Sequence, residues 1–243
     1  MGFLSLGYAQ QPYSVHINQT KGLPSNAVYD VYQDKSGFIW LATQEGISRY
    51  DGVEFTTYNC DAQVSTAGSC IKEDKFGRIW YENFDGRLYY VYQDSLYDLK
   101  QKSVFNYAPF AITSKYLMLM QSNSVDIYDI SSLKFKKRIS IPWQSNFFEN
   151  SYSFGEDFYI TLQDSIFCIH NDLTITRSGY FVGKNEQMKR LSASDSFVFA
   201  VSKTNTNKAL NVFDRKLNYL KTINIPEPNL IQGVNFLDGY FWV

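Results

Sequence analysis

A short segment near the start of the chain returns forty positions later. Residues 34–40 read DKSGFIW, and residues 74–80 read DKFGRIW. The positions that the two copies share include Asp34, Gly37, Trp40 and Gly46 in the first, and Asp74, Gly77, Trp80 and Gly86 in the second. A fixed period near forty residues indicates an array of similar structural units.

Within one repeat the sequence alternates between strand-forming runs and turns. In the first repeat we expect strands at 27–33, 38–43, 46–50 and 53–58, separated by turns that contain Asp or Gly. Trp40 and Trp80 would pack between neighbouring sheets, where a large aromatic side chain covers about 150–250 Å² of surface. Four short strands in a forty-residue unit are typical of a β-propeller blade.

Later units keep the strand pattern and lose the tryptophan motif. We expect strand pairs at 117–120 with 125–129, at 158–162 with 165–169, and at 197–201 with 210–214, the last pair joined by a long polar loop at 203–208. The predicted fold is therefore all-β: a β-propeller of four-stranded antiparallel blades, with about five complete blades, the start of a sixth and an incomplete ring.

The predicted divisions of the chain follow from this pattern. Residues 10–25 form a closing strand and lead-in, with a strand at 13–17 that would complete the last blade of a closed ring. The blades are expected at 26–60, 61–99, 100–141, 142–185 and 186–225, and a truncated sixth at 226–243. An incomplete ring predicts that the chain is a fragment of a longer protein.

The first residues indicate export. They read MGFLSLGYAQQ, an apolar run with the small residues Gly7 and Ala9 at −3 and −1 before Gln10, so residues 1–9 are predicted to be the remnant of a signal peptide. No later stretch approaches the ~18 apolar residues of a membrane span. The formal net charge of -1 argues against a nucleic-acid surface.

Three cysteines are too few and too scattered for a disulfide scaffold or a zinc site. Cys60 and Cys70 could form a disulfide in an exported protein. Cys168 lies in an apolar run and is expected to be a buried small hydrophobic residue.

Residues 22–26 (GLPSN) and 33–52 (QDKSGFIWLATQEGISRYDG) closely resemble the two-component regulator propeller repeat. The resemblance is strong over 22–58, clear over 70–92 and limited to the strand pattern afterwards. It implies the periplasmic sensor region of a membrane histidine kinase of the Bacteroidetes type. It also implies a parent protein that forms homodimers and meets the membrane only through segments that follow the propeller. Kinase activity is implied for that parent and not for this chain.

Catalytic and metal-binding patterns are not found in the sequence. The two histidines, His16 and His170, lack the spacing of a base or metal motif, and no phosphate loop, dinucleotide fingerprint or nucleophile elbow occurs. We therefore expect no catalytic residue, no metal and no cofactor.

Ligand binding is expected on loops carried by the rigid blades. The turns between strands one and two and between strands three and four are short and repetitive, whereas the other connections vary and carry polar side chains. The candidate ligand-binding residues on those other connections are Thr43, Gln44, Glu45, Glu82, Asn83, Gln121, Asn123, Gln163 and Asp164, together with Trp143 as a platform for sugar rings. Amides and carboxylates suit sugar hydroxyls, so the predicted ligand is nutrient-derived, such as an oligosaccharide.

Two other functions fit the same pattern. The propeller could be an interaction or dimerisation module without a small ligand, or a propeller lyase or glycosidase. A glycosidase would need paired carboxylates, which repeats can bring together from distant positions.

Overall fold

The computed structural model describes residues 15–61, 63–102, 110–141, 151–161, 165–179, 187–203, 208–225, 235–237 and 240–242. Within these ranges the chain is all-β apart from one short 3-10 helix, η1 (Gln19–Lys21). The described strands form five four-stranded sheets and one two-stranded sheet, and every pairing is between chain neighbours and antiparallel.

The strands follow one another in regular groups of four. The first sheet holds β1 (Val28–Gln33), β2 (Ile39–Thr43), β3 (Gly46–Tyr50) and β4 (Phe55–Tyr58). The second holds β5 (Gly68–Glu73), β6 (Ile79–Asn83), β7 (Arg87–Tyr92) and β8 (Ser95–Lys102), and the third holds β9 (Phe110–Ile112), β10 (Tyr116–Gln121), β11 (Ser124–Asp129) and β12 (Phe135–Ser140). The fourth holds β13 (Ser151–Phe154), β14 (Asp157–Thr161), β15 (Ile166–Ile169) and β16 (Ile175–Arg177). The fifth holds β17 (Gln187–Ala193), β18 (Phe197–Lys203), β19 (Lys208–Asp214) and β20 (Tyr219–Ile225), and β21 (Asn235–Leu237) pairs with β22 (Tyr240–Trp242).

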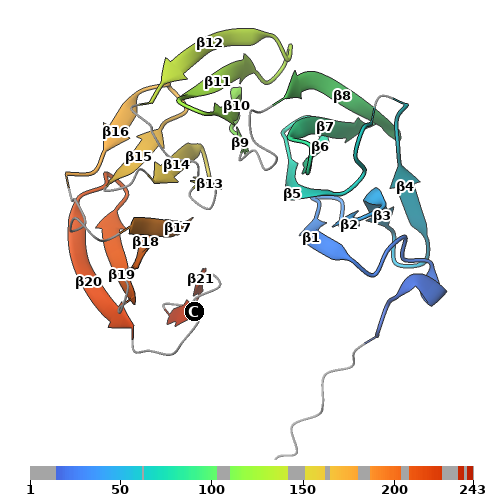
Figure 1. Ribbon diagram of the computed structural model, residues 1–243, viewed down its shortest axis with the longest axis horizontal. Coiled ribbons are helices and arrows are strands. Elements are labelled where there is room, and N and C mark those ends of the chain that lie inside the picture. The colour runs from blue at the N-terminus through green and yellow to red at the C-terminus, as the bar shows by residue number, and fades with distance from the viewer. Residues whose placement is uncertain are drawn as a thin grey trace, which may run out of the picture.

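The sheets stand side by side around an arc, as Figure 1 shows. The first strand of each four-stranded sheet lies on the inner side of the arc and the fourth strand on the outer side, and the arc does not close into a ring. The predicted propeller of four-stranded antiparallel blades, with its incomplete ring, is confirmed.

The core of the molecule lies between blades. Trp80 and Tyr81 are neighbours on β6 and both are fully buried, although successive side chains of a strand point to opposite faces. Tyr81 packs in a cluster with residues of the first blade such as Ile47, whereas Trp80 packs with residues of the third blade such as Leu117. Strand β6 therefore carries apolar residues on both faces, because the second blade is covered on both sides.

Three predicted elements differ from the structure. Residues 15–17 of the predicted closing strand form no strand, since a strand requires a hydrogen-bonded neighbour. Residues 13–14 of the same predicted strand lie outside the described residues. The predicted loop at 203–208 is shorter than expected, since Lys203 and Lys208 are paired ends of β18 and β19. Strand β8 runs to Lys102, three residues beyond the predicted end of the second blade.

Candidate functional site

The repeated Asp–Trp motif builds the same turn in the first two blades. Asp34 Oδ1 accepts hydrogen bonds from the backbone N–H groups of Ser36 (2.9 Å) and Phe38 (3.0 Å), and Trp40 Nε1 donates to Asp34 Oδ2 at 2.7 Å. Asp is common at the start of tight turns because its side chain can accept a hydrogen bond from the backbone N–H group two residues later. The carboxylate thus fixes both the turn and the orientation of the tryptophan.

The second copy reproduces this geometry and adds a cation. Asp74 Oδ1 accepts from the N–H groups of Phe76 (2.8 Å) and Arg78 (3.1 Å), and Trp80 Nε1 donates to Asp74 Oδ2 at 2.8 Å. Arg78 Nε also donates to Asp74 Oδ2 at 2.5 Å, and the guanidinium reaches the carbonyl oxygen of Ile130 in the third blade. The two tryptophans therefore occupy equivalent environments.

The glycines of the repeat have a conformational role. Gly37 and Gly77 close the two turns with φ of 90° and 75°, and Gly46 and Gly86 have φ of 112° and 75°. Positive φ is readily adopted by glycine and costs other residues energy. The two copies therefore keep glycine at these positions because the backbone there adopts a positive φ.

Antiparallel order places the turns between strands one and two and between strands three and four on one face of the propeller, here called the link face. Several contacts on this face join neighbouring blades. Lys35 N donates to Glu73 Oε2 at 3.0 Å, and Arg49 NH1 lies 3.1 Å from Asp94 Oδ1. Between the third and fourth blades, Ser114 N donates to a carboxylate oxygen of Glu156 at 2.8 Å. The link face thus carries contacts between neighbouring blades.

The opposite face, here called the loop face, carries the connections that were predicted to bind a ligand. Three of the predicted residues are buried there and serve the blades themselves. Thr43 Oγ1 donates to the carbonyl of Gly46 at 3.1 Å, Asn83 Nδ2 donates to the carbonyl of Ser65 at 2.8 Å, and Glu82 is 1% exposed. The side chains of Thr43 and Asn83 therefore stabilise turns and strand ends.

Other predicted residues on the loop face remain accessible. Gln44, Glu45 and Asn123 are exposed and Gln121 is half-buried. Trp143, Gln163 and Asp164 lie outside the described residues, so their place in a site stays a prediction.

The possible disulfide between Cys60 and Cys70 is not formed in the structure. Cys60 packs at the interface of the first and second blades, whereas Cys70 packs at the interface of the second and third. The second blade therefore lies between them. Cys168 is fully buried, as expected.

On the inner side of the arc, one lysine connects three blades. Lys72 on β5 donates from Nζ to Ser153 Oγ on β13 at 2.6 Å, and the ammonium lies 5.7 Å from the ring centroid of Phe110 on β9. Burial lowers the pKa of Lys72 below its ordinary value, while Cys70 and Asp30 act in the opposite direction. The inner strands are thus joined by polar contacts as well as by packing.

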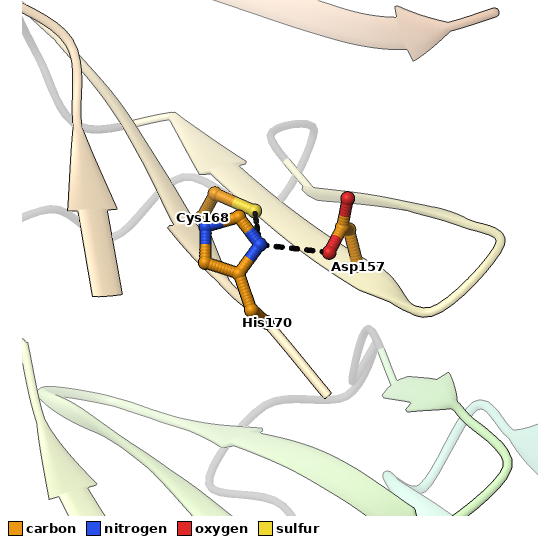
Figure 2. Close-up of side chains that lie close together, drawn as sticks. All are labelled: Asp157, Cys168 and His170. Carbon is orange, nitrogen blue, oxygen red and sulfur yellow. Dashed lines mark hydrogen bonds and ion pairs between the residues drawn. The ribbon is translucent and has the colours of Figure 1, made fainter. Parts of the chain in front are cut away.

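One cluster of chemically reactive side chains was not foreseen. Asp157 at the start of β14, Cys168 on β15 and His170 just after β15 bring an oxygen, a sulfur and a nitrogen atom within 4.8 Å of one another (Figure 2). His170 Nδ1 lies 2.8 Å from Asp157 Oδ1 and 3.6 Å from Cys168 Sγ. The predicted pairing of 158–162 with 165–169 already placed Asp157 opposite His170, so the signal was present in the strand register.

The surroundings of Asp157 determine its charge. Burial raises the pKa of this carboxyl, but hydrogen bonds from His170, Tyr159 and Arg215 outweigh that effect and lower the pKa below its ordinary value. Arg215 comes from the turn after β19, and its NH2 group lies 2.6 Å from Asp157 Oδ2. The cluster therefore joins the fourth blade to the fifth on the link face.

Among the residues that the structure describes, no helix is long and apolar enough to cross a membrane.

The comparisons with known proteins agree with this fold. The family model of the two component regulator propeller matches residues 22–45, which include the first Asp–Trp turn, and so confirms the predicted resemblance over this part of the chain. No curated protein matches the sequence.

Solved structures share the architecture. The chain is similar to the extracellular domain of the hybrid two component system BT3049 from B. thetaiotaomicron, at 18% identity and a TM-score of 0.61, covering 85% of this chain and 31% of that one. The corresponding domain of BT4673 from the same organism gives 16% identity, a TM-score of 0.64 and coverages of 88% and 32%. A streptogramin B lyase gives 16% identity, a TM-score of 0.70 and coverages of 90% and 76%.

At these identities the likeness shows the fold alone. The chain spans about a third of the length of the two extracellular domains that it matches, with 31% and 32% of them covered.

Proposed function

We propose that this propeller is part of the sensor region of a two-component histidine kinase and lies on the periplasmic side of the inner membrane. The observation that carries the proposal is the match of residues 22–45 to the two component regulator propeller. The second copy of the Asp–Trp turn, with equivalent hydrogen bonds, supports it. In this proposal the kinase activity and the pairing of two copies belong to the full-length parent.

We further propose that the loop face binds a nutrient-derived ligand such as an oligosaccharide. Gln44, Glu45 and Asn123 are exposed on the loop face. Their amide and carboxylate groups can exchange hydrogen bonds with sugar hydroxyls. A ligand that binds one arrangement of the paired sensors better than the other would shift the population of kinase states.

Two measurements test these statements separately. Reading the coding sequence beyond Val243 for a membrane span and a kinase core tests the two-component assignment, and a parent that lacks both would contradict it. Thermal-shift screening of the complete propeller against neutral oligosaccharides tests the ligand. A ligand at a hundred times its Kd stabilises the folded state by about 2.7 kcal/mol, which raises the Tm measurably.

Variants then locate the site. Replacing Gln44 and Glu45 together with alanine should abolish the shift, while Lys75→Ala, an exposed position on the link face, should leave it unchanged. If no sugar raises the Tm and a partner protein does, the propeller is an interaction module. If the double variant and the wild type respond equally, the ligand binds elsewhere.

We propose that the chain acts by binding and not by catalysis. His170 has both ring nitrogens in hydrogen bonds, to Asp157 Oδ1 and to Thr176 Oγ1 at 2.8 Å each. Both partners belong to the fourth blade, so these hydrogen bonds support a structural role for His170. Turnover of a glycan or of a streptogramin B compound by the purified propeller would refute this statement.

A further inference from the structure

The fourth blade presents three potential metal ligands at the edge of the link face. Asp157 and His170 flank the paired strands β14 and β15, and Cys168 points to the same side as they do (Figure 2). We propose that this cluster binds one borderline-soft divalent cation, Zn²⁺ above all, through Asp157 Oδ1, Cys168 Sγ and His170 Nδ1. Carboxylate, thiolate and imidazole are all established zinc ligands.

Two of the three distances between the ligand atoms are close to those of a tetrahedral site, and the third, between the Asp157 carboxylate and Cys168 Sγ, lies within 4.8 Å and would have to shorten toward roughly 3.6 Å. With Zn–S of about 2.3 Å and Zn–N of about 2.0–2.1 Å, the sulfur and nitrogen of such a site lie roughly 3.6 Å apart. Cys168 Sγ and His170 Nδ1 are 3.6 Å apart. Asp157 Oδ1 and His170 Nδ1, now at 2.8 Å, would have to separate by roughly half an ångström, which a small rotation of either side chain provides.

Contacts behind two of the three ligands, Asp157 and His170, already hold them in place. Tyr159 OH donates to Asp157 Oδ2 at 3.0 Å and Arg215 donates to the same oxygen, so Oδ1 is left directed toward His170. Nε2 of His170 lies 2.8 Å from Thr176 Oγ1. Hydrogen bonds of this kind orient metal ligands and fix the imidazole tautomer.

The partial exposure of the cluster allows a cation to reach it. On binding, Zn²⁺ would take the place of the Cys168 thiol proton, which leaves to solvent. The side chains of Asp157 and His170 are 18% and 27% exposed. Solvent can therefore reach the site, and a water molecule can complete the coordination.

The test uses the purified chain after dialysis against a chelator. We expect it to bind one equivalent of Zn²⁺, measured by elemental analysis and by competition with a chromogenic chelator. With Co²⁺ as a spectroscopic probe, a thiolate-to-metal charge-transfer band should appear. His170→Gln, at a partly exposed position, should weaken binding about tenfold or more and remove the charge-transfer band or alter it.

Matched controls separate this site from adventitious binding. His16→Gln and Cys60→Ala remove the other histidine and another thiol, and both should bind Zn²⁺ as the wild type does. Asp157→Asn gives a second test should His170→Gln fold poorly, and the folded state of each variant is checked by circular dichroism. No retained Zn²⁺ in the wild type, or equal affinity in His170→Gln and wild type, would overturn the proposal.

Discussion

At the scale of single residues, Asp34 and Asp74 occupy the same position in two copies of a turn but are expected to contribute differently to stability. Both accept the indole N–H of a tryptophan and two backbone N–H groups. Asp74 is 2% exposed and also neutralises Arg78, which is 7% exposed, whereas the first copy has Phe38 at the position of Arg78. The second turn therefore contains a buried ion pair and the first does not.

Replacing each aspartate by alanine should reveal this difference. Asp74→Ala leaves the buried guanidinium of Arg78 without its counter-charge and should lower the free energy of unfolding by about 3–5 kcal/mol. Asp34→Ala removes only hydrogen bonds of the turn and of Trp40, and should cost about 1–3 kcal/mol. Urea denaturation of the two variants measures both values; equal losses would show that the Asp74–Arg78 pair adds no stability.

At the scale of strands, the pairing of β5 with β6 requires a glycine. A Cβ atom placed on Gly68 would lie 2.1 Å from the carbonyl oxygen of Glu82 and 2.9 Å from the Cα of Asn83. Both are backbone atoms of the neighbouring strand, so they cannot move away without breaking the pairing. Strand β5 also has an irregular register between Ser69 and Lys72, and Cys70 there has a positive φ of 58°.

Gly68→Ala should therefore destabilise the second blade. We expect a loss of about 3 kcal/mol in the free energy of unfolding, the upper part of the range for forced steric overlap. The matched control is Gly179→Ala, since a Cβ there meets nothing within 4 Å, and its effect should stay within about 0.5 kcal/mol. Thermal or chemical denaturation compares the two variants. Similar stability of both would mean that the close approach of β5 to β6 is wrong.

At the scale of the whole molecule, stability depends on aromatic residues buried between blades. Tyr58 and Tyr89 lie between the first and second blades, and Tyr128 lies between the second and third. Burial raises the pKa of each of these phenols to about 12. The unfolded chain ionises its tyrosines at about 10.

This shift predicts a loss of stability in alkali. Because the folded state favours the neutral phenol, the stabilisation is complete below a pH of about 10 and declines as the pH rises through about 12. The Tm should thus fall between pH 9 and pH 11.5, measured by thermal unfolding at fixed ionic strength. Tyr89→Phe has no phenol to ionise at a fully buried position and should lose less stability over this range. If both proteins respond alike, burial of Tyr89 is not a cause of the alkaline loss.

Much of the fold could be predicted from local sequence. The forty-residue period, the turns at Asp34 and Asp74 and the strand pairs at 117–129 and 158–169 depend on neighbours along the chain, which the sequence displays directly. The structure confirms these elements to within a few residues. The match of residues 22–45 to the two component regulator propeller rests on the same local pattern.

The candidate sites depended on packing between blades, which spacing does not reveal. Thr43 and Asn83 belong to polar turns in the sequence, yet burial makes them part of the scaffold. Cys60 and Cys70 are close along the chain and are separated by a sheet. Asp157, Cys168 and His170 meet because an antiparallel register brings strand ends together and the fifth blade supplies Arg215. The sequence by itself determined which segments form strands and turns, since these follow from local conformational preference. Only the tertiary structure decided which side chains are buried and which of them meet, since contacts between sheets set both.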